Sequence, residues 1–371
     1  MAKAKYTPGK DGRFQTKVWD GTYNPDGRKH YIPIYSTKFS GDLEKKVNAM
    51  KAAVADRKYV TPTDETFLTY ARSWLTVYKK VRQLNTQRMY ENIIEKHLII
   101  LDGIRLQDLR KIHFQSVINN ALKMPRTCQQ IALTFRQIVK SAIQDKKLPE
   151  GSYRDICTGI DIPKYKPNEK RPLTPEEKAA IKAADFTPRE KAFVLLIYAT
   201  GLRRGEALAQ TKFTINLKKH ELYVNEAVAF DKNTPYIKCT KNERKRPVPL
   251  PGYLVDYLDQ YMRTIPGTYL FGKLNGEIMT KSSYDKMWKS ITNKINLAAG
   301  GSEDLQVIFN LTAHVFRHNY CTNLCYQIPA ISIKKIAALM GDTEKMVIEV
   351  YNHIMEEKEN PANVVENAVA L

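Results

Sequence analysis

Cysteines and long apolar runs are both scarce in this sequence. The 371 residues include only five cysteines, an odd number without a CxxC pair, which disfavours a disulfide framework and a cysteine-rich zinc site. No run approaches the roughly 20 apolar residues that cross a bilayer, and the first residues lack the apolar segment of a signal peptide. We therefore expect a cytoplasmic protein with reduced thiols and no membrane partner.

Acidic residues are also scarce relative to basic ones. Lys and Arg number 59 against 39 Asp and Glu, a formal net charge of +20. Residues 1–165 hold 30 basic and 16 acidic residues, so most of the excess lies in the first half of the chain. Such an excess is larger than solubility requires and favours a polyanionic partner. On charge alone, that partner is DNA, RNA or an anionic membrane surface.

Residues 1–60 are predicted to form a small antiparallel sheet followed by a helix. Turn sequences rich in Gly, Asp and Asn surround two runs of β-branched and aromatic residues, Phe14 to Trp19 and Tyr31 to Thr37. A basic face of this sheet either lies in a DNA groove or is a solvated charged surface. Its candidate DNA contacts are Lys17, Arg28 and Lys38.

Residues 62–162 show a helical pattern with almost no strand signal. Apolar residues recur three and four positions apart, which predicts a bundle of about four helices with Trp74 and Tyr78 in its core. Basic residues follow the first of these helices and are further candidate DNA contacts. They are Lys79, Lys80 and Arg82.

A linker and a third domain follow. Residues 163–173 combine three prolines with four basic residues and lack an apolar period, as is typical of a linker. Thr174 is followed by Pro175 and by Glu177, the pattern of a helix capping box. We expect an α+β domain over residues 174–371. The whole chain is then a multidomain protein, mainly α-helical with small β-sheets.

Two motifs in the third domain place cations where they can meet an anion. Gly201 ends one predicted helix, and Arg203 begins the next, where Glu206 can hold its guanidinium by a charge-assisted hydrogen bond. Lys241 and Arg244 lie in a cation-rich hairpin. The hairpin either reaches an oxygen of bound DNA or protects a sheet edge from aggregation.

Two further motifs lie near the C-terminus. His314 and Arg317 are one helical turn apart, which places a titratable group beside a permanent cation. His314 and His318 have the spacing of some zinc ligands, but the Glu of the HExxH motif is absent, so we expect no metal site. Tyr351 follows on an amphipathic stretch, where a tyrosine taken alone is more typical of packing.

The order and spacing of these motifs resemble the tyrosine recombinases of the phage integrase family. That family has an Arg in TGxRxxE, a hairpin Lys, HxxR, and a Tyr nine residues after a His or Trp. Residues 200–206 read TGLRRGE, Lys241 precedes Pro249 by eight residues, His314 and Arg317 match HxxR, and Tyr351 is nine residues past Asp342. The resemblance covers residues 170–360. The preceding segments resemble the arm-binding and core-binding domains of integrases of conjugative transposons and phages.

Asp342 departs from this pattern, because the family usually has His or Trp at that position. A carboxylate cannot donate a hydrogen bond to a phosphate oxygen and would repel it. Either Asp342 accepts a hydrogen bond from Tyr351 or an arginine, or the position contributes little. The sequence leaves both alternatives open.

The resemblance implies a site-specific recombinase that integrates and excises a mobile element through a 3′-phosphotyrosine on Tyr351. It also implies that Arg203 and Arg317 bind the phosphate, that Lys241 and His314 move protons, and that Glu206 and His318 support them. No metal or other cofactor is expected. Two alternatives are relaxation of supercoils, as by a type IB topoisomerase, and a DNA-binding regulator that has lost catalysis, for which Asp342 is the sign.

The partners that the resemblance implies are DNA and further copies of the chain. Double-stranded DNA would be bound at core and arm sites by a homotetramer on two duplexes, with a monomer in solution and an excision factor as further options. The tail ends in apolar residues spaced as one face of a short helix, which we expect to dock on its own or a neighbouring catalytic domain. These residues are Val364, Val365, Ala368, Val369 and Leu371.

Overall fold

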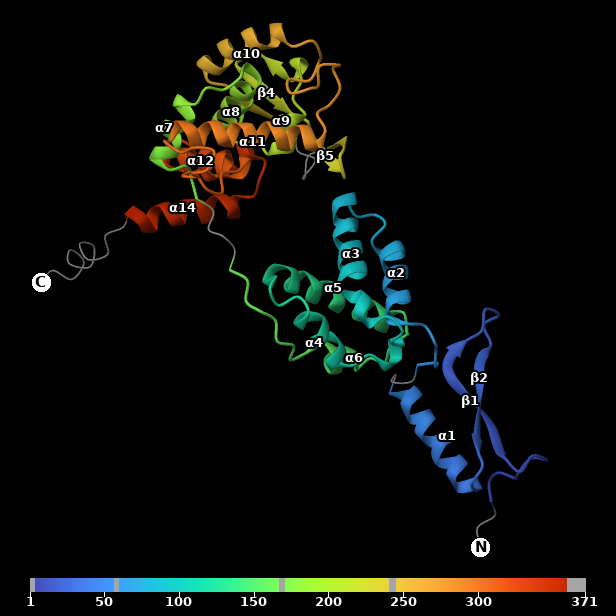
Figure 1. Ribbon diagram of the computed structural model, residues 1–371. Helices are drawn as coiled ribbons and strands as arrows, with labels where there is room; N and C mark the ends of the chain where they lie inside the picture. The colour runs from blue at the N-terminus through green and yellow to red at the C-terminus, as the bar shows by residue number, and fades with distance from the viewer. Residues whose placement is uncertain (1–3, 57–59, 167–170, 240–244, 359–371) are drawn as a thin grey trace, which may run out of the picture. The chain divides into compact units, whose positions relative to one another are not determined.

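The computed structural model describes residues 4–56, 60–166, 171–239 and 245–358. These residues form two compact units, one up to Pro167 and one from Asn168 (Figure 1). Both are built mainly from helices with small antiparallel sheets, so the predicted fold class is confirmed. Within the described ranges, no helix combines the length and the apolar character needed to cross a membrane.

The first unit begins with a two-stranded antiparallel sheet and one helix. The strands are β1 (Phe14–Tyr23) and β2 (Lys29–Ser36), and the helix is α1 (Ser40–Ala55). Val18 on the sheet packs with Leu43 and Val47 on the helix, and this contact buries all three side chains. The two strands and the helix expected from the turn signals are therefore present.

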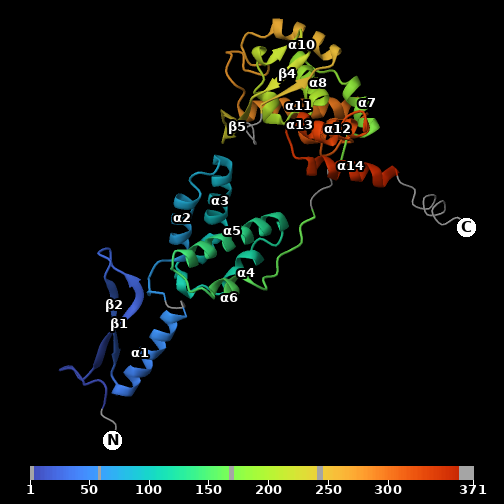
Figure 2. The ribbon, with the colours of Figure 1, turned by 180° about the vertical axis from the view of Figure 1, so that it is seen from behind.

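A helical bundle completes this unit (Figure 2). It comprises α2 (Phe67–Tyr78), α3 (Leu84–Lys96), α4 (Lys111–Asn119), α5 (Pro125–Gln144), α6 (Ser152–Cys157) and two 3-10 turns, Leu98–Leu101 and Leu106–Asp108. Trp74 is buried in the core as predicted, but the prediction for Tyr78 is wrong, since 45% of this residue is exposed. Tyr78 is the last residue of α2, beyond the turns that pack, and its hydroxyl donates to Asp145.

The second unit contains eight described helices. They are α7 (Pro175–Ala183), α8 (Pro188–Thr200), α9 (Arg204–Leu208), α10 (Gly252–Thr264), α11 (Lys281–Ala298), α12 (Ala313–Cys325), α13 (Ile333–Met340) and α14 (Glu344–Lys358). The capping box expected at the start of α7 is present. The Thr174 hydroxyl accepts from the Glu177 N–H at 3.2 Å, and Glu177 Oε2 accepts from the Thr174 N–H at 2.9 Å.

Two small sheets lie beside these helices. One has the order β3 (Ile215–Asn216), β4 (Glu221–Val224), β7 (Arg246–Pro249), and the other pairs β5 (Glu226–Asp231) with β6 (Thr234–Cys239). The larger hydrophobic core of the unit joins α8, α10 and α11 to the three-stranded sheet, and a smaller one joins α12, α13 and α14. The strand character of residues 213–224 and 235–250 predicts β3, β4, β6 and β7, whereas β5 was not predicted.

Candidate functional site

The turn between α8 and α9 positions the first functional side chain, Arg203. Gly201 closes α8 in the left-handed conformation (φ +61), and a Cβ there would lie 2.4 Å from the Tyr320 ring, so a glycine is required. Leu202 is fully buried, which fixes Arg203 as the N-cap of α9. Glu206 Oε1 accepts from Arg203 Nη1 at 3.0 Å, and Oε2 accepts from the Arg203 backbone N–H at 3.1 Å. The predicted hydrogen bond is therefore present.

Helix α12 brings Arg317 to the same place. The residue is only 5% exposed, and its guanidinium donates to the carbonyl oxygens of Gly201 and Met340, each at 2.8 Å. His314 is exposed on the first turn of this helix, and His318 is half-buried one residue after Arg317. In the described parts of the chain, no three His, Cys, Asp or Glu side chains are grouped as metal ligands.

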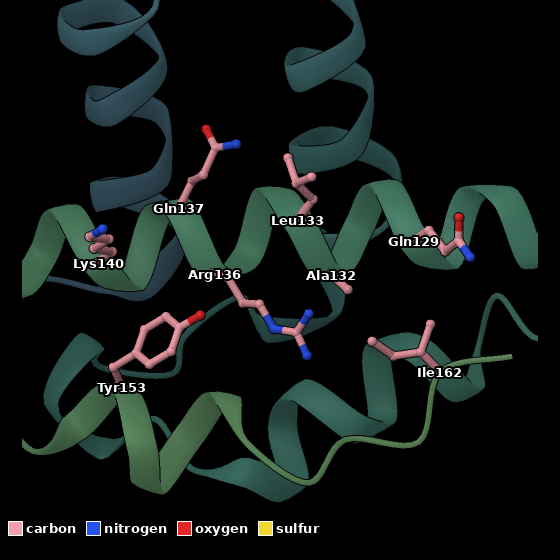
Figure 3. Close-up of a pocket in the computed structure, with 8 residues that line it drawn as sticks. All are labelled: Gln129, Ala132, Leu133, Arg136, Gln137, Lys140, Tyr153 and Ile162. Atoms are coloured by element: carbon pink, nitrogen blue, oxygen red, sulfur yellow. The ribbon is translucent and has the colours of Figure 1, made fainter. Parts of the chain in front are cut away.

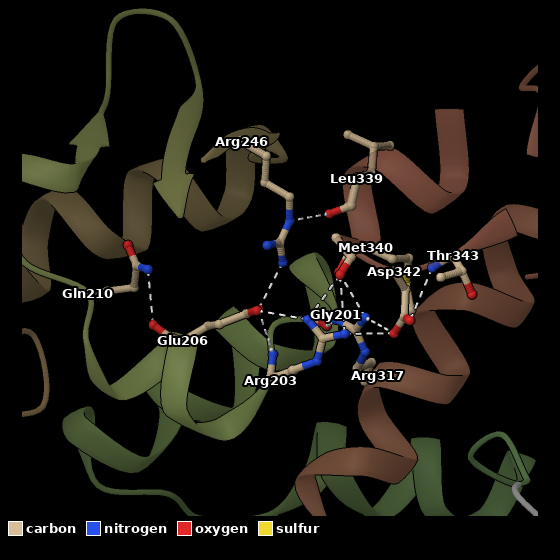
Figure 4. A network of polar contacts seen from close by, with 11 residues as sticks. Gly201, Arg203, Glu206, Gln210, Arg246, Arg317, Leu339, Met340, Asp342 and Thr343 are labelled. Atoms are coloured by element: carbon tan, nitrogen blue, oxygen red, sulfur yellow. Dashed lines mark hydrogen bonds and ion pairs between the residues drawn. The ribbon is translucent and has the colours of Figure 1, made fainter. Parts of the chain in front are cut away.

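Asp342 lies between the two arginines. Its Oδ2 accepts from Arg203 Nη2 at 2.7 Å and from Arg317 Nη2 at 3.0 Å, so two guanidinium groups meet on one oxygen (Figure 4). Its Oδ1 accepts from the Thr343 N–H at 3.1 Å. Of the alternatives that the sequence left open, the structure therefore selects hydrogen bonding to arginine.

A third arginine, Arg246, belongs to this network and was not singled out from the sequence. It is 7% exposed, its Nε donates to the Leu339 carbonyl at 2.8 Å, and its Nη2 donates to Glu206 Oε2 at 2.8 Å. Strand β7 alternates between buried and exposed residues, and Arg246 shares the buried face with Val248. This alternation is the signal by which the sequence could have identified it.

The three arginines converge on the C-terminal end of α13. Arg246 donates to the carbonyl of residue 339, Arg317 to that of residue 340, and Arg203 to that of residue 341 at 3.1 Å. The last carbonyls of a helix lack partners within it and form the negative end of its dipole, so cations stabilise them. Gly341 closes the helix in the left-handed conformation (φ +60) and lets Arg246 approach, because a Cβ there would lie 2.4 Å from its Nη1.

Burial and charge act in opposite directions on the ionisable groups of this network. Burial lowers the pKa of Arg317 to about 10, aided by the charge of Arg203. Burial alone would raise the pKa of Asp342, but Arg203 and Arg317 outweigh it and lower that pKa. Burial likewise opposes ionisation of Glu206, whose pKa is nonetheless lowered by Arg246 and Arg203. Three cations and two anions therefore coexist at neutral pH, which leaves one net positive charge.

Two further residues, Tyr351 and Lys241, are predicted to be catalytic. Tyr351 is half-buried on α14 and packs in the small core with Val347 and Ile354. Helix α14, which carries Tyr351, begins two residues after Asp342, so a short connection joins it to the arginine network. Lys241 and Arg244 lie outside the described residues, between β6 and β7.

The other candidate DNA contacts belong to the first unit. Lys17, Arg28, Lys38, Lys80 and Arg82 are exposed. Lys79 is half-buried with its ammonium group 4.6 Å from the Trp74 ring centroid, and this burial lowers its pKa. A pocket of about 350 Å³ also lies between α5 and α6, with Arg136, Lys140 and Tyr153 in its lining (Figure 3). The sequence did not indicate this pocket.

Comparison with known proteins gives family and structural matches. The model of the phage integrase family matches residues 173–358, and that of the phage integrase N-terminal SAM-like domain matches residues 66–122. The chain is 22% identical to tyrosine recombinase XerD of Pseudomonas aeruginosa, over 73% of this chain and 87% of that protein. It is 24% identical to a XerC-like tyrosine recombinase of Caldanaerobacter subterraneus, over 91% of this chain and 92% of that protein.

Solved structures match over most of the chain. The Tn1549 transposon integrase in complex with a circular intermediate DNA has a TM-score of 0.65 at 17% identity, over 77% of this chain and 95% of that one. A lambda integrase tetramer bound to a Holliday junction has a TM-score of 0.59 at 14% identity, over 93% of each chain. At these identities, the likeness concerns the fold.

Proposed function

Because the chain belongs to the phage integrase family, we infer that its arginine network is the place where DNA strands are cut and rejoined. The chain is a tyrosine recombinase, an enzyme of site-specific DNA recombination. The observation that carries the assignment of the site is the convergence of Arg203 and Arg317 on one oxygen. Two planar guanidinium groups aimed at one anionic oxygen are suited to a phosphodiester.

The reaction exchanges one phosphodiester for another. The Tyr351 hydroxyl loses its proton and attacks the scissile phosphorus, and the bond from phosphorus to the 5′-oxygen breaks. The DNA is left with a 3′-phosphotyrosine and a free 5′-hydroxyl. Attack by a 5′-hydroxyl of a partner strand reverses the step and completes strand exchange. Each bond broken is replaced by one of similar energy, so the reaction requires no nucleotide hydrolysis.

Each side chain of the site has its own role in this reaction. Arg203 and Arg317 bind the non-bridging oxygens and stabilise the negative charge that builds at phosphorus. Lys241 protonates the leaving 5′-oxygen, and His314 accepts the tyrosine proton or donates a hydrogen bond beside it. Glu206 and Arg246 are positioning residues, because they contact Arg203 and the end of α13. His318 supports its neighbours on α12, His314 and Arg317.

The biological role that fits this chemistry is integration and excision of a mobile element. Residues 1–60 would bind arm sites, residues 62–162 would bind core sites, and residues 174–371 would carry out catalysis. Four copies would act on two duplexes, with or without an excision factor. The lambda integrase tetramer on a Holliday junction supports this arrangement by analogy of fold.

The experiment that tests the assignment uses a nicked core-site substrate, which traps the covalent intermediate. The wild-type protein should form a DNA adduct that migrates slowly in a denaturing gel, and it should do so in the presence of a chelator. Tyr351→Phe should form no adduct and bind DNA with nearly unchanged affinity, because it removes one hydroxyl and no charge. An adduct in this variant would mean that another residue is the nucleophile.

A further inference from the structure

The side chain of Asp342 occupies the point at which Arg203 and Arg317 converge. Its Oδ2 is within 3.0 Å of a guanidinium nitrogen from each of Arg203 and Arg317. A carboxylate presents a flat pair of anionic oxygens to these groups, much as a phosphodiester presents its two non-bridging oxygens. We propose that Asp342 is a built-in competitor of the scissile phosphate and holds the site closed until DNA displaces it.

The charges of the network explain why Asp342 and a phosphate cannot both bind to the two arginines. With Asp342 in place, the anions of the network leave one of its three positive charges uncompensated. A phosphodiester entering beside an ionised Asp342 would place two like charges on the same two guanidinium groups. At such distances, like charges in a partly buried site repel strongly. The carboxylate must therefore leave as the phosphate enters.

Asp342 is not required to hold either arginine in place. Arg203 is also bonded to Glu206 Oε1 at 3.0 Å and to the Gly341 carbonyl at 3.1 Å. Arg317 is also bonded to the carbonyl oxygens of Gly201 and Met340. Both guanidinium groups would keep two hydrogen-bond partners after the carboxylate left. A purely structural role therefore does not explain the contact of Asp342 with the two arginines.

The geometry limits how the carboxylate can leave. The backbone of Asp342 is fixed, because its N–H donates to the Ala337 carbonyl at 3.0 Å and the preceding Gly341 is the left-handed helix cap. The side chain is 24% exposed and so has a path to solvent. Displacement is therefore a rotation of one side chain and leaves the C-terminal end of α13 in place.

The test measures binding of inorganic phosphate to the full-length protein without DNA, so it is independent of strand cleavage. Asp342→Asn keeps the shape of the side chain and removes its charge. This variant should bind phosphate at least about tenfold more tightly than the wild type, which is the low end of the effect of one unit charge at contact distance. Combining Asp342→Asn with Arg203→Ala should abolish the gain. Asp259→Asn removes an exposed carboxylate of the same unit, which pairs with Arg263 on its own helix, and it should not change phosphate binding.

Three outcomes would overturn the proposal. They are equal phosphate affinity of Asp342→Asn and the wild type, an equal gain in Asp259→Asn, and loss of the folded structure in both Asp342→Asn and Asp342→Ser. The last would show that the carboxylate is a brace. The proposal rests on the proposed function, yet the two can fail separately, since an adduct that still forms in Tyr351→Phe refutes the role of Tyr351 and leaves the phosphate measurement intact. If both hold, Asp342→Asn should also form the Tyr351 adduct faster than the wild type.

Discussion

The guanidinium of Arg317 is almost completely enclosed, and its pKa of about 10 lies well above neutral pH, so it stays charged. A buried charge acts through a lower effective dielectric than an exposed one, and its attraction to a developing anion is correspondingly stronger. Arg203 is more accessible, with 22% of its side chain exposed. In the proposed mechanism, the two arginines therefore act on the same phosphate from different environments.

Removing either arginine should slow strand cleavage sharply. We expect Arg203→Ala and Arg317→Ala each to lose about 2.7–4 kcal/mol of transition-state stabilisation, the scale of one missing oxyanion contact, with Arg317 at the upper end. The measurement is the rate of adduct formation on the nicked substrate. Arg263→Ala removes an exposed arginine of the same unit and should cleave at the wild-type rate. Losses below threefold would mean that the pair does not bind the phosphate.

The role of Lys241 rests on the sequence, because this residue lies outside the described ranges. Lys241→Ala should cleave ordinary DNA slowly and should recover on a substrate whose 5′-bridging oxygen is replaced by sulfur, since a thiolate leaves without a proton. The measurement is the cleavage rate of Lys241→Ala on each of the two substrates, relative to that of the wild type. A variant that stays equally slow on both would assign the general acid to another residue.

At the scale of elements, the end of α13 is the part on which the site depends most. Gly341→Ala should destabilise the protein by about 1–2 kcal/mol from the left-handed backbone, and by about 1–3 kcal/mol more from displacing Arg246. Gly300→Ala is the matched control, because Gly300 also has a positive φ but no atom lies within 4 Å of its added Cβ. Gly300→Ala should lose only the about 1–2 kcal/mol of stability that comes from the left-handed backbone. Urea unfolding measures both, and equal losses would contradict close packing at Gly341.

Most helices and their ends could be predicted from the sequence, because the information is local. Gly201 predicted the end of α8, and the capping box at Thr174 predicted the start of α7. Strand β5 was missed because its turn to β6 places Lys232 in the left-handed region (φ +53), where the sequence offers no glycine as a signal. Tyr78 was misplaced because helical periodicity does not show where packing ends.

The site could be predicted less completely than the elements. The motif spacing identified Arg203, Glu206 and Arg317, which the structure brings together, and also Asp342. The partner of Asp342 remained open, because Arg203 and Asp342 are 139 positions apart in the chain. Arg246 was missed since it stands among other cations, although the alternation of β7 places it on the buried face together with Val248.

At the scale of the whole molecule, assembly should control cleavage. Residues 362–371 lie outside the described ranges, and their apolar spacing predicts a short helix that must dock on a catalytic domain, its own or a neighbour's. We propose docking on the neighbour. Deleting them should spare DNA binding and reduce both tetramer assembly and recombination of paired sites. Gel filtration with DNA and a recombination assay measure these effects. A truncated protein that assembles and recombines at the full-length rate would exclude docking on the neighbour.

The three arginines come from residues 203, 246 and 317, and their acceptors come from residues 339–342. Ribosomes synthesise a chain from its N-terminus, so the basic segments proposed to bind DNA are made before these acceptors exist. A chain still in synthesis at Arg317 has neither the end of α13 nor Tyr351. In the proposed mechanism, prematurely terminated chains could therefore bind DNA through these basic segments, but they could not nick it.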